Sequence, residues 1–166
     1  GAAIGAFART RGRGDGMNIG KLLTKSARSF PDHLATVQGS NRQTYARFNG
    51  RCNQLANALG RLGVRQGDHV AVLMYNCPQM LESIFACFKA GAGSVPINFR
   101  LHPREFAFII DHSRAKTVLI SAEFAGALAE IRDGIPGVKH VIAVAGADGA
   151  TQGNSLDYET LLAAES

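Results

Sequence analysis

Cysteine is scarce in this 166-residue sequence, which has only Cys52, Cys77 and Cys87 and no Cys-x-x-Cys pair. An odd number of thiols without paired spacing argues against a disulfide framework and against a cysteine zinc site. Three thiols outside any framework are typical of a reducing compartment, so we expect a cytoplasmic protein. Cys77 stands at the expected start of a helix, where the dipole can lower a thiol pKa, but an inert thiol is the simpler interpretation.

Long hydrophobic runs are also missing, since no apolar segment approaches the roughly 20 residues that a membrane span requires. The net charge of +5 is only moderately basic. No Lys/Arg cluster with interleaved aromatic residues occurs beyond the first residues, so a nucleic-acid partner is not predicted. Peripheral contact with a membrane and homo-oligomer formation are both compatible with this composition.

Recognisable catalytic motifs are absent as well. The sequence has no Gly-x-Ser-x-Gly elbow and no Gly-x-x-x-x-Gly-Lys-Ser/Thr loop, and no strand precedes the glycines of residues 12–16. The five histidines form no His-x-x-x-His or His-Glu-x-x-His pair: His33, His69, His102, His112 and His140. The sequence therefore predicts no catalytic residue, no cofactor-binding residue and no metal ligand.

The first 16 residues, GAAIGAFARTRGRGDG, differ from the rest in being rich in Gly, Ala and Arg without a periodic apolar pattern. They precede the first methionine, Met17, and are interpreted as an upstream leader or a cloning remnant. A transit peptide is an alternative that their arginines favour and their few hydroxyl residues oppose. The predicted organisation is thus residues 1–16 as a leader and residues 17–166 as the folded part.

The stretch from Gly67 to Leu101 organises the remainder of the chain. Val70–Met74 is a continuous apolar run, which is typical of a strand whose sheet is covered on both faces. Asn76 is a candidate helix cap and Pro78 suits the first turn of that helix. The predicted buried stripe of this helix comprises Leu81, Ile84, Phe85 and Phe88, and Gly91 and Gly93 end it. Ser94–Ile97 then returns as a second strand, which predicts a parallel βαβ unit with Pro96 at a strand end or edge.

Other elements on both sides of this unit follow the same alternation. Thr44–Leu62 is predicted as a helix capped by Thr44, with Phe48, Leu55 and Leu59 in the core. The remaining expectations are a helix from Asn18, a hairpin formed by Leu34–Gln38 and a return strand at Gln43, a helix from Pro103 with a possible Arg100–Glu105 pair, strands Thr117–Ile120 and Val138–Val144, a helix Glu123–Asp133, a loop Gly146–Asn154 and a last helix capped by Ser155. Together they predict an α/β fold whose sheet has largely parallel buried strands with helices on both faces.

Four segments, in this order and at this spacing, resemble the adenylate-forming superfamily, most closely its fatty acyl-CoA synthetases. They are Gly67–Val72 (GDHVAV), Asn76–Pro78 (NCP), Phe88–Ala92 (FKAGA) and Val95–Leu101 (VPINFRL). Thr44 and Tyr45 also match the Thr-Tyr-x-Glu-Leu motif of the superfamily, although Arg47 replaces its acid. The resemblance covers about Met17 to Ser166 and implies the first part of the large N-terminal domain of such an enzyme.

The resemblance implies that the parent enzyme activates a carboxylic acid, expected to be a fatty acid, as acyl-AMP and transfers it to coenzyme A. ATP, Mg2+ and coenzyme A are the implied cofactors of the parent, and none is expected to bind this segment. The superfamily's phosphate loop, ATP-binding motif, ribose-binding Asp and catalytic Lys all belong to later regions. We therefore expect a fragment that is inactive alone.

Several alternatives to a fatty acyl-CoA synthetase stay open at this point. The parent can be a fatty acyl-AMP ligase, an aryl-CoA ligase or a peptide-synthetase adenylation domain. The Asn98-x-Arg100-Leu101 ending is more similar to acyl-CoA synthetases, because peptide-synthetase domains tend to carry Asp at position 98. The chain can also be a free-standing small α/β binding module, against which the missing phosphate-binding loop argues.

Overall fold

A computed structural model of the chain describes residues 18–146 and 155–165. The predicted leader, residues 1–16, and nearly all of the predicted loop at 146–154 lie outside the described residues. The helices and strands in chain order are α1 Gly20–Ser29, β1 Leu34–Gln38, β2 Asn41–Thr44, α2 Tyr45–Arg61, β3 His69–Leu73, α3 Pro78–Ala90, β4 Gly93–Pro96, α4 Pro103–His112, β5 Thr117–Ser121, α5 Ala125–Glu130, β6 His140–Val144, β7 Leu156–Asp157 and α6 Tyr158–Ala163. Short 3-10 turns flank α5 at Ala122–Phe124 and Arg132–Gly134.

Five strands form one sheet in the order β4-β3-β5-β6-β7, and every pairing in it is parallel. The predicted βαβ unit is confirmed, with β3 beside β4 and Val72 opposite Pro96. Pro96 ends the edge strand β4, a position where its missing N–H costs no ladder bond. This strand order places a crossover helix on each side of the sheet, as in doubly wound folds.

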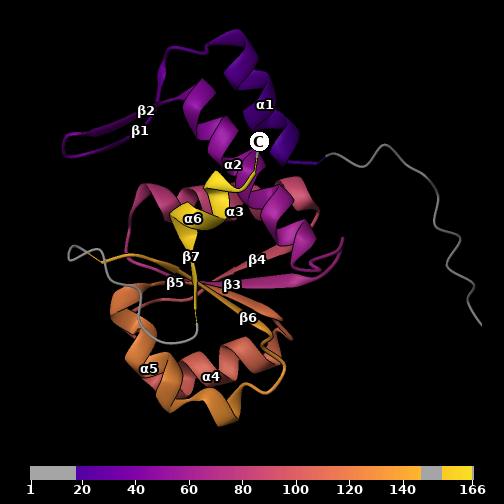
Figure 1. Ribbon diagram of the computed structural model, residues 1–166, viewed down its shortest axis with the longest axis vertical. Coiled ribbons are helices and arrows are strands. Elements are labelled where there is room, and N and C mark those ends of the chain that lie inside the picture. The colour runs from indigo at the N-terminus through magenta and orange to yellow at the C-terminus, as the bar shows by residue number, and fades with distance from the viewer. Residues whose placement is uncertain (1–17, 147–154, 166) are drawn as a thin grey trace, which may run out of the picture.

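Helices cover both faces of the sheet, as the sequence predicts (Figure 1). The two faces alternate along β3, because Val70 and Val72 belong to one core cluster and Ala71 and Leu73 to the other. The first cluster packs against α2, α3 and α6, and the second packs against α4 and α5. All residues of β3 after His69, and all of β5, are buried, which explains their unbroken apolar sequence.

Helix α1 and the β1–β2 hairpin lie beyond α2 and α3, on the side away from the sheet (Figure 1). The hairpin is confirmed, with Gln38 opposite Asn41 and Gly39 in the left-handed region at φ +57°. The predicted cap is also confirmed, because the N–H of Arg47 donates to Thr44 Oγ1 at 3.3 Å. A third small core joins these parts through the buried side chains of Leu23, Phe48 and Cys52.

The predicted buried stripe of α3 is wrong. The buried side chains of this helix include Glu82, Ser83, Ala86 and Cys87, whereas Leu81 is 44% exposed. Ile84, Phe85 and Phe88 are only half-buried. The physical reason is that α3 packs on both the sheet and α2, and the close approach of two neighbours requires small residues. The large apolar residues instead occupy the flank, where Phe85 packs edge-on against Phe48 at 5.7 Å.

Two further predictions require correction near the end of the chain. The expected helix Glu123–Asp133 is divided into α5 and two 3-10 turns. The last helix is capped by Asp157 rather than Ser155, since Asp157 Oδ1 accepts the N–H of Thr160 at 2.7 Å. The two residues before α6 form β7, a strand too short for its pattern to be seen in the sequence.

Candidate functional site at the carboxyl edge of the sheet

In open parallel sheets, ligands bind outside the carboxyl ends of the strands, near the point where the strand order reverses. Here the chain passes from β3 to β4 on one side and then returns to β5 on the other side of β3. The carboxyl edge at β3, β4 and β5 is therefore the place to examine for a site. Residues 74–76, 97–100 and 122–124 follow these strands, and Ser121 ends β5.

The reversal point between β3 and β5 is filled by Tyr75. Its backbone N–H donates to Ser121 Oγ at 3.2 Å, which ties the end of β3 to the end of β5. The Tyr75 ring lies 4.9 Å from the ring of Phe99 and 4.8 Å from that of Phe124. This aromatic cluster leaves the neighbouring space, between β4 and the start of α3, as the open part of the edge.

A hollow of about 530 Å³ occupies that space. Its walls are mainly apolar, and its polar groups are the side chains of Asn76, Asn98 and Arg100; the lining consists of Met74, Asn76, Met80, Pro96, Ile97, Asn98, Phe99 and Arg100. The polar set contains two amides and one guanidinium and no carboxylate. Such a hollow suits a ligand with an apolar body and an anionic group.

Arg100 does not form the predicted pair with Glu105. Glu105 Oε2 instead accepts the backbone N–H of His102 at 2.8 Å, in a capping box at the start of α4. No ion pair formed within residues 18–146 and 155–165 includes Arg100. Its guanidinium carbon lies 5.7 Å from the centre of the Phe99 ring, and Asn98 Oδ1 accepts its backbone N–H at 3.0 Å. The guanidinium is thus placed at the hollow with its hydrogen-bonding capacity available.

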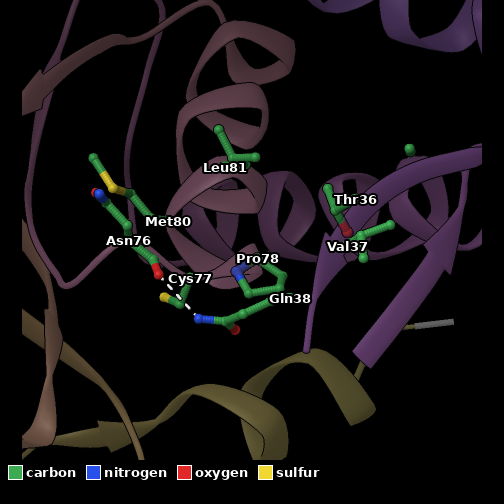
Figure 2. A pocket seen from close by; sticks show the side chains of 9 residues that line it. Thr36, Val37, Gln38, Asn76, Cys77, Pro78, Met80 and Leu81 are labelled. Atoms are coloured by element: carbon green, nitrogen blue, oxygen red, sulfur yellow. Dashed lines mark hydrogen bonds between the residues drawn. The ribbon is translucent and has the colours of Figure 1, made fainter. Parts of the chain in front are cut away.

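A second hollow of about 460 Å³ lies on the other side of Asn76, between the β1–β2 hairpin and the start of α3 (Figure 2). Gln38 Nε2 donates to the backbone carbonyl of Asn76 at 3.0 Å and links the hairpin to this edge. The predicted capping role of Asn76 is wrong, because the N-cap is Cys77 and no side chain caps the helix. Burial raises the pKa of Cys77, so its thiol is not activated by the helix dipole.

One fully buried carboxylate, Glu82, lies away from both hollows and is saturated with partners. Glu82 Oε1 accepts from Arg51 Nε at 2.7 Å and from Gln43 Nε2 at 2.9 Å, and Oε2 accepts from the Tyr158 hydroxyl at 2.7 Å. Burial and the neighbouring Glu82 raise the pKa of Tyr158 well above its ordinary value. Because these partners come from β2, α2 and α6, the network ties three elements to α3 and occupies both oxygens of Glu82.

Neither a cluster of metal-ligating side chains nor a membrane-spanning helix occurs in the part of the chain that the structure describes. Within it, no group of three or more His, Cys, Asp or Glu side chains is arranged to hold a metal ion. The lining of the 530 Å³ hollow also offers no carboxylate to a Mg2+ ion. Among the described helices, none is long and apolar enough to cross a membrane.

The sequence predicts no site residue, and the structure brings together three that it treats as structural or leaves without a role. The sequence predicts a helix cap for Asn76 and an ion pair for Arg100, and neither residue forms the expected interaction. The signal that identifies Asn76, Asn98 and Arg100 is their position directly after β3 and β4. That signal depends on knowing that the two strands are parallel neighbours.

Comparison with protein families gives one match that spans most of the chain. The family model described as AMP-binding enzyme matches residues 23–163. Among curated relatives, the 4-hydroxybutyrate–CoA ligase 2 of Metallosphaera sedula is 38% identical over 114 residues, which is 69% of this chain and 21% of that protein. The long-chain-fatty-acid–CoA ligase FadD13 of Mycobacterium tuberculosis is 38% identical over 117 residues, covering 69% of this chain and 23% of its own length.

Solved structures agree with these relatives in fold. The anthranilate CoA ligase AuaEII in complex with anthranoyl-AMP superimposes with a TM-score of 0.85 at 26% identity, over 90% of this chain and 28% of that one. The N-terminal domain of FACL13 from Mycobacterium tuberculosis superimposes with a TM-score of 0.79 at 32% identity, over 90% of this chain and 36% of that one. The chain thus spans about a fifth to a quarter of the length of the curated relatives described above.

Proposed function

The chain belongs to the family of AMP-binding enzymes, and from this premise we propose that it is part of an ATP-dependent acid–thiol ligase. Residues 17–166 would form the opening portion of the large N-terminal domain of that enzyme, and residues 1–16 a leader outside it. The observation that carries the proposal is the family match over residues 23–163, and it is supported by two relatives and one solved structure that are named as CoA ligases.

The proposed reaction has two steps. A carboxylate oxygen of the acid attacks the α-phosphorus of ATP, and the bond to pyrophosphate breaks, which gives acyl-AMP. The thiol of coenzyme A then attacks the acyl carbonyl, AMP leaves with the carboxylate oxygen, and the thiol proton is released. The names of the relatives include 4-hydroxybutyrate, long-chain fatty acids and anthranilate, so a carboxylic acid is the shared substrate class. A fatty acid is our preferred substrate, and an aryl acid is the alternative.

Within this reaction we assign the 530 Å³ hollow to a phosphate group of one of the two nucleotide substrates, ATP or coenzyme A. Arg100 supplies a planar guanidinium without an acidic partner among the described residues, and the amide of Asn98 supplies a second donor. Arginine is well suited to phosphate because its parallel N–H groups bind two oxygens at once. We derive no step through Mg2+, because the lining of this hollow offers it no carboxylate.

A cytoplasmic location is part of the same proposal. It is supported by the three free thiols, Cys52, Cys77 and Cys87. The two curated relatives are named as CoA ligases, which favours an acyl-CoA synthetase over a fatty acyl-AMP ligase. The family match favours both of these enzymes over a free-standing binding module.

The test is thioester formation by a form of the protein that also carries the downstream motifs of the family. We expect ATP- and coenzyme A-dependent conversion of a carboxylic acid to its thioester, with AMP as coproduct, across a panel of aliphatic and aryl acids. Arg100→Gln should raise the KM for ATP or for coenzyme A about ten-fold or more, the equivalent of one charge-assisted hydrogen bond, with kcat little changed.

Arg104→Gln is the matched control, because Arg104 is exposed and lies outside the hollow. It should leave both KM values unchanged. Absence of thioester with every acid in a folded protein would overturn the proposed function. Normal turnover with unchanged KM values in Arg100→Gln would overturn only the assignment of the hollow.

A further inference from the structure

Exposed large apolar side chains are concentrated at the start of the described chain. Of the nine in the structure, five lie between residues 19 and 37: Ile19, Leu22, Phe30, Leu34 and Val37. Leu22 is 56% exposed and Phe30 is 53% exposed, although both are large enough to belong to a core. Leu22 lies in α1 and Phe30 directly follows it, and exposed apolar side chains of this size suit a surface that meets an apolar partner.

A stripe of cations runs beside these residues along α1. Lys21, Lys25 and Arg28 are spaced at i, i+4 and i+7 and thus share one helix face, opposite the buried Leu23 and Ala27. They line a hollow of about 520 Å³ together with the side chains of Thr24 and Ser29. Helix α1 contains no acidic residue, and none of the three cations forms an ion pair within the described residues.

The position of α1 leaves this stripe uncovered by the described elements. The helix packs on α2 and α3 with its other face, and it lies on the outside of the molecule, away from the sheet (Figure 1). Over residues 18–44 the sequence has four basic residues, Lys21, Lys25, Arg28 and Arg42, against one acidic residue, Asp32. The surface is therefore positively charged and open.

We propose that this surface, formed by Lys21, Leu22, Lys25, Arg28 and Phe30, binds the face of a lipid bilayer that contains anionic headgroups. Cations on one helix face are attracted to anionic lipids, and exposed apolar side chains beside them bury themselves at the headgroup boundary. A nucleic acid would bind the cations and offer a base to stack on Phe30, but it would give Leu22 no apolar surroundings. The proposal does not depend on the enzymatic activity, because it rests on α1 and the corner after it.

The test is sedimentation of the full chain with vesicles made of equal parts of phosphatidylcholine and phosphatidylserine, beside vesicles of phosphatidylcholine alone. We expect binding to the anionic vesicles only. Each cation near the surface contributes about a five-fold gain in partition, so the double variant Lys25→Gln/Arg28→Gln should bind about 25-fold more weakly. The double variant Arg104→Gln/Lys139→Gln loses the same charge from exposed positions outside the proposed surface, and should bind like the unaltered chain.

The apolar part of the surface has its own matched pair. Phe30→Ser should weaken binding several-fold, whereas Phe108→Ser, at a phenylalanine of α4 that is 67% exposed, should leave it unchanged. The four cations changed in the double variants and both phenylalanines are exposed. The unfolding midpoints of all variants should therefore agree, which would confirm that each variant folds.

Three results would overturn the proposal. Absence of binding to anionic vesicles would remove its basis. Equal weakening by both double variants would assign the attraction to net charge. Weakening by the α1 double variant without any effect of Phe30→Ser would indicate a purely electrostatic partner, such as the phosphate backbone of a nucleic acid, in place of a bilayer.

Discussion

Arg51 forms two ion pairs that have equal length and very different surroundings. Arg51 Nε lies 2.7 Å from Glu82 Oε1, and Arg51 Nη2 lies 2.7 Å from Glu159 Oε1. The Glu82 side chain is 0% exposed and the Glu159 side chain is 55% exposed. The two pairs share Arg51 and the same shortest distance, and they differ in the burial of the glutamate and in the hydrogen bonds that buried Glu82 also accepts from Gln43 and Tyr158.

The substitutions Glu82→Gln and Glu159→Gln compare the buried and the exposed ion pair. Glu82→Gln keeps the shape of the side chain but replaces charge-assisted hydrogen bonds from Arg51 in a buried site, which should lower the free energy of unfolding by about 1.5–3 kcal/mol. Glu159→Gln removes an exposed pair and should cost about 0–1 kcal/mol. Burial lowers the pKa of Arg51, yet its hydrogen bonds to Glu159 and Glu82 outweigh this and raise it overall.

Urea denaturation at neutral pH, followed by circular dichroism, measures both losses in the same buffer. The slopes of the unfolding curves should agree with that of the unaltered chain, so that a change in midpoint reports stability. Equal losses in the two variants, or a larger loss in Glu159→Gln, would refute the argument that burial decides the strength of these pairs.

Three further predictions concern the fold. Leu59→Ala should lower the free energy of unfolding by about 2–5 kcal/mol because Leu59 is fully buried, and a loss below roughly 0.5 kcal/mol would contradict its place in the core. Gly91→Ala should lower the free energy of unfolding by about 1–2 kcal/mol, because Gly91 has φ +72° and a Cβ there would meet Gln66 Cγ at 3.2 Å. Gly126 lies in open space within α5, so Gly126→Ala should be neutral or stabilising in the same urea assay. Burial and Glu82 raise the pKa of Tyr158 in the folded protein. The stability that the neutral Tyr158 hydroxyl contributes should therefore be complete below the unfolded pKa of about 10 and should be lost as the pH rises further. The urea midpoint of Tyr158→Phe should not show this loss at alkaline pH.

The sheet could be predicted because its signals are local and redundant. β3 and β5 are buried on both faces, so every residue along their middle is apolar, and no alternative period competes with that pattern. The βαβ unit adds Pro78 at a helix start and Gly91 at its end, where the left-handed φ of +72° favours glycine. Local sequence and tertiary structure agree at each of these positions.

The orientation of α3 could not be predicted, because a stripe of large apolar residues does not identify the buried face of a helix that packs on two sides. Ala86 and Cys87 are small enough for α3 to approach the sheet closely, and Glu82 is tolerated in the interior only because Arg51 and Tyr158 reach it from other helices. Those partners are 31 and 76 residues away in the chain. No local pattern contains that information.

The candidate site was hidden for a related reason. Asn76 and Arg100 have short-range partners in the sequence, and a reading of nearby residues assigns them to a cap and an ion pair. In the structure, Cys77 takes the cap position and the His102 backbone takes Glu105, which leaves Arg100 available at the hollow. The site emerges only when parallel pairing brings the ends of β3 and β4 together.

The proposed function is tested most directly by acid-dependent exchange of labelled pyrophosphate into ATP, since this reports the first half-reaction without coenzyme A. The assay compares the purified 166-residue chain with a form that also carries the downstream motifs of the family. We predict exchange by the extended form when a carboxylic acid is supplied, and no exchange by residues 1–166 alone. Clear exchange by the 166-residue chain, or none by a folded extended form with any acid of the panel, would contradict the account.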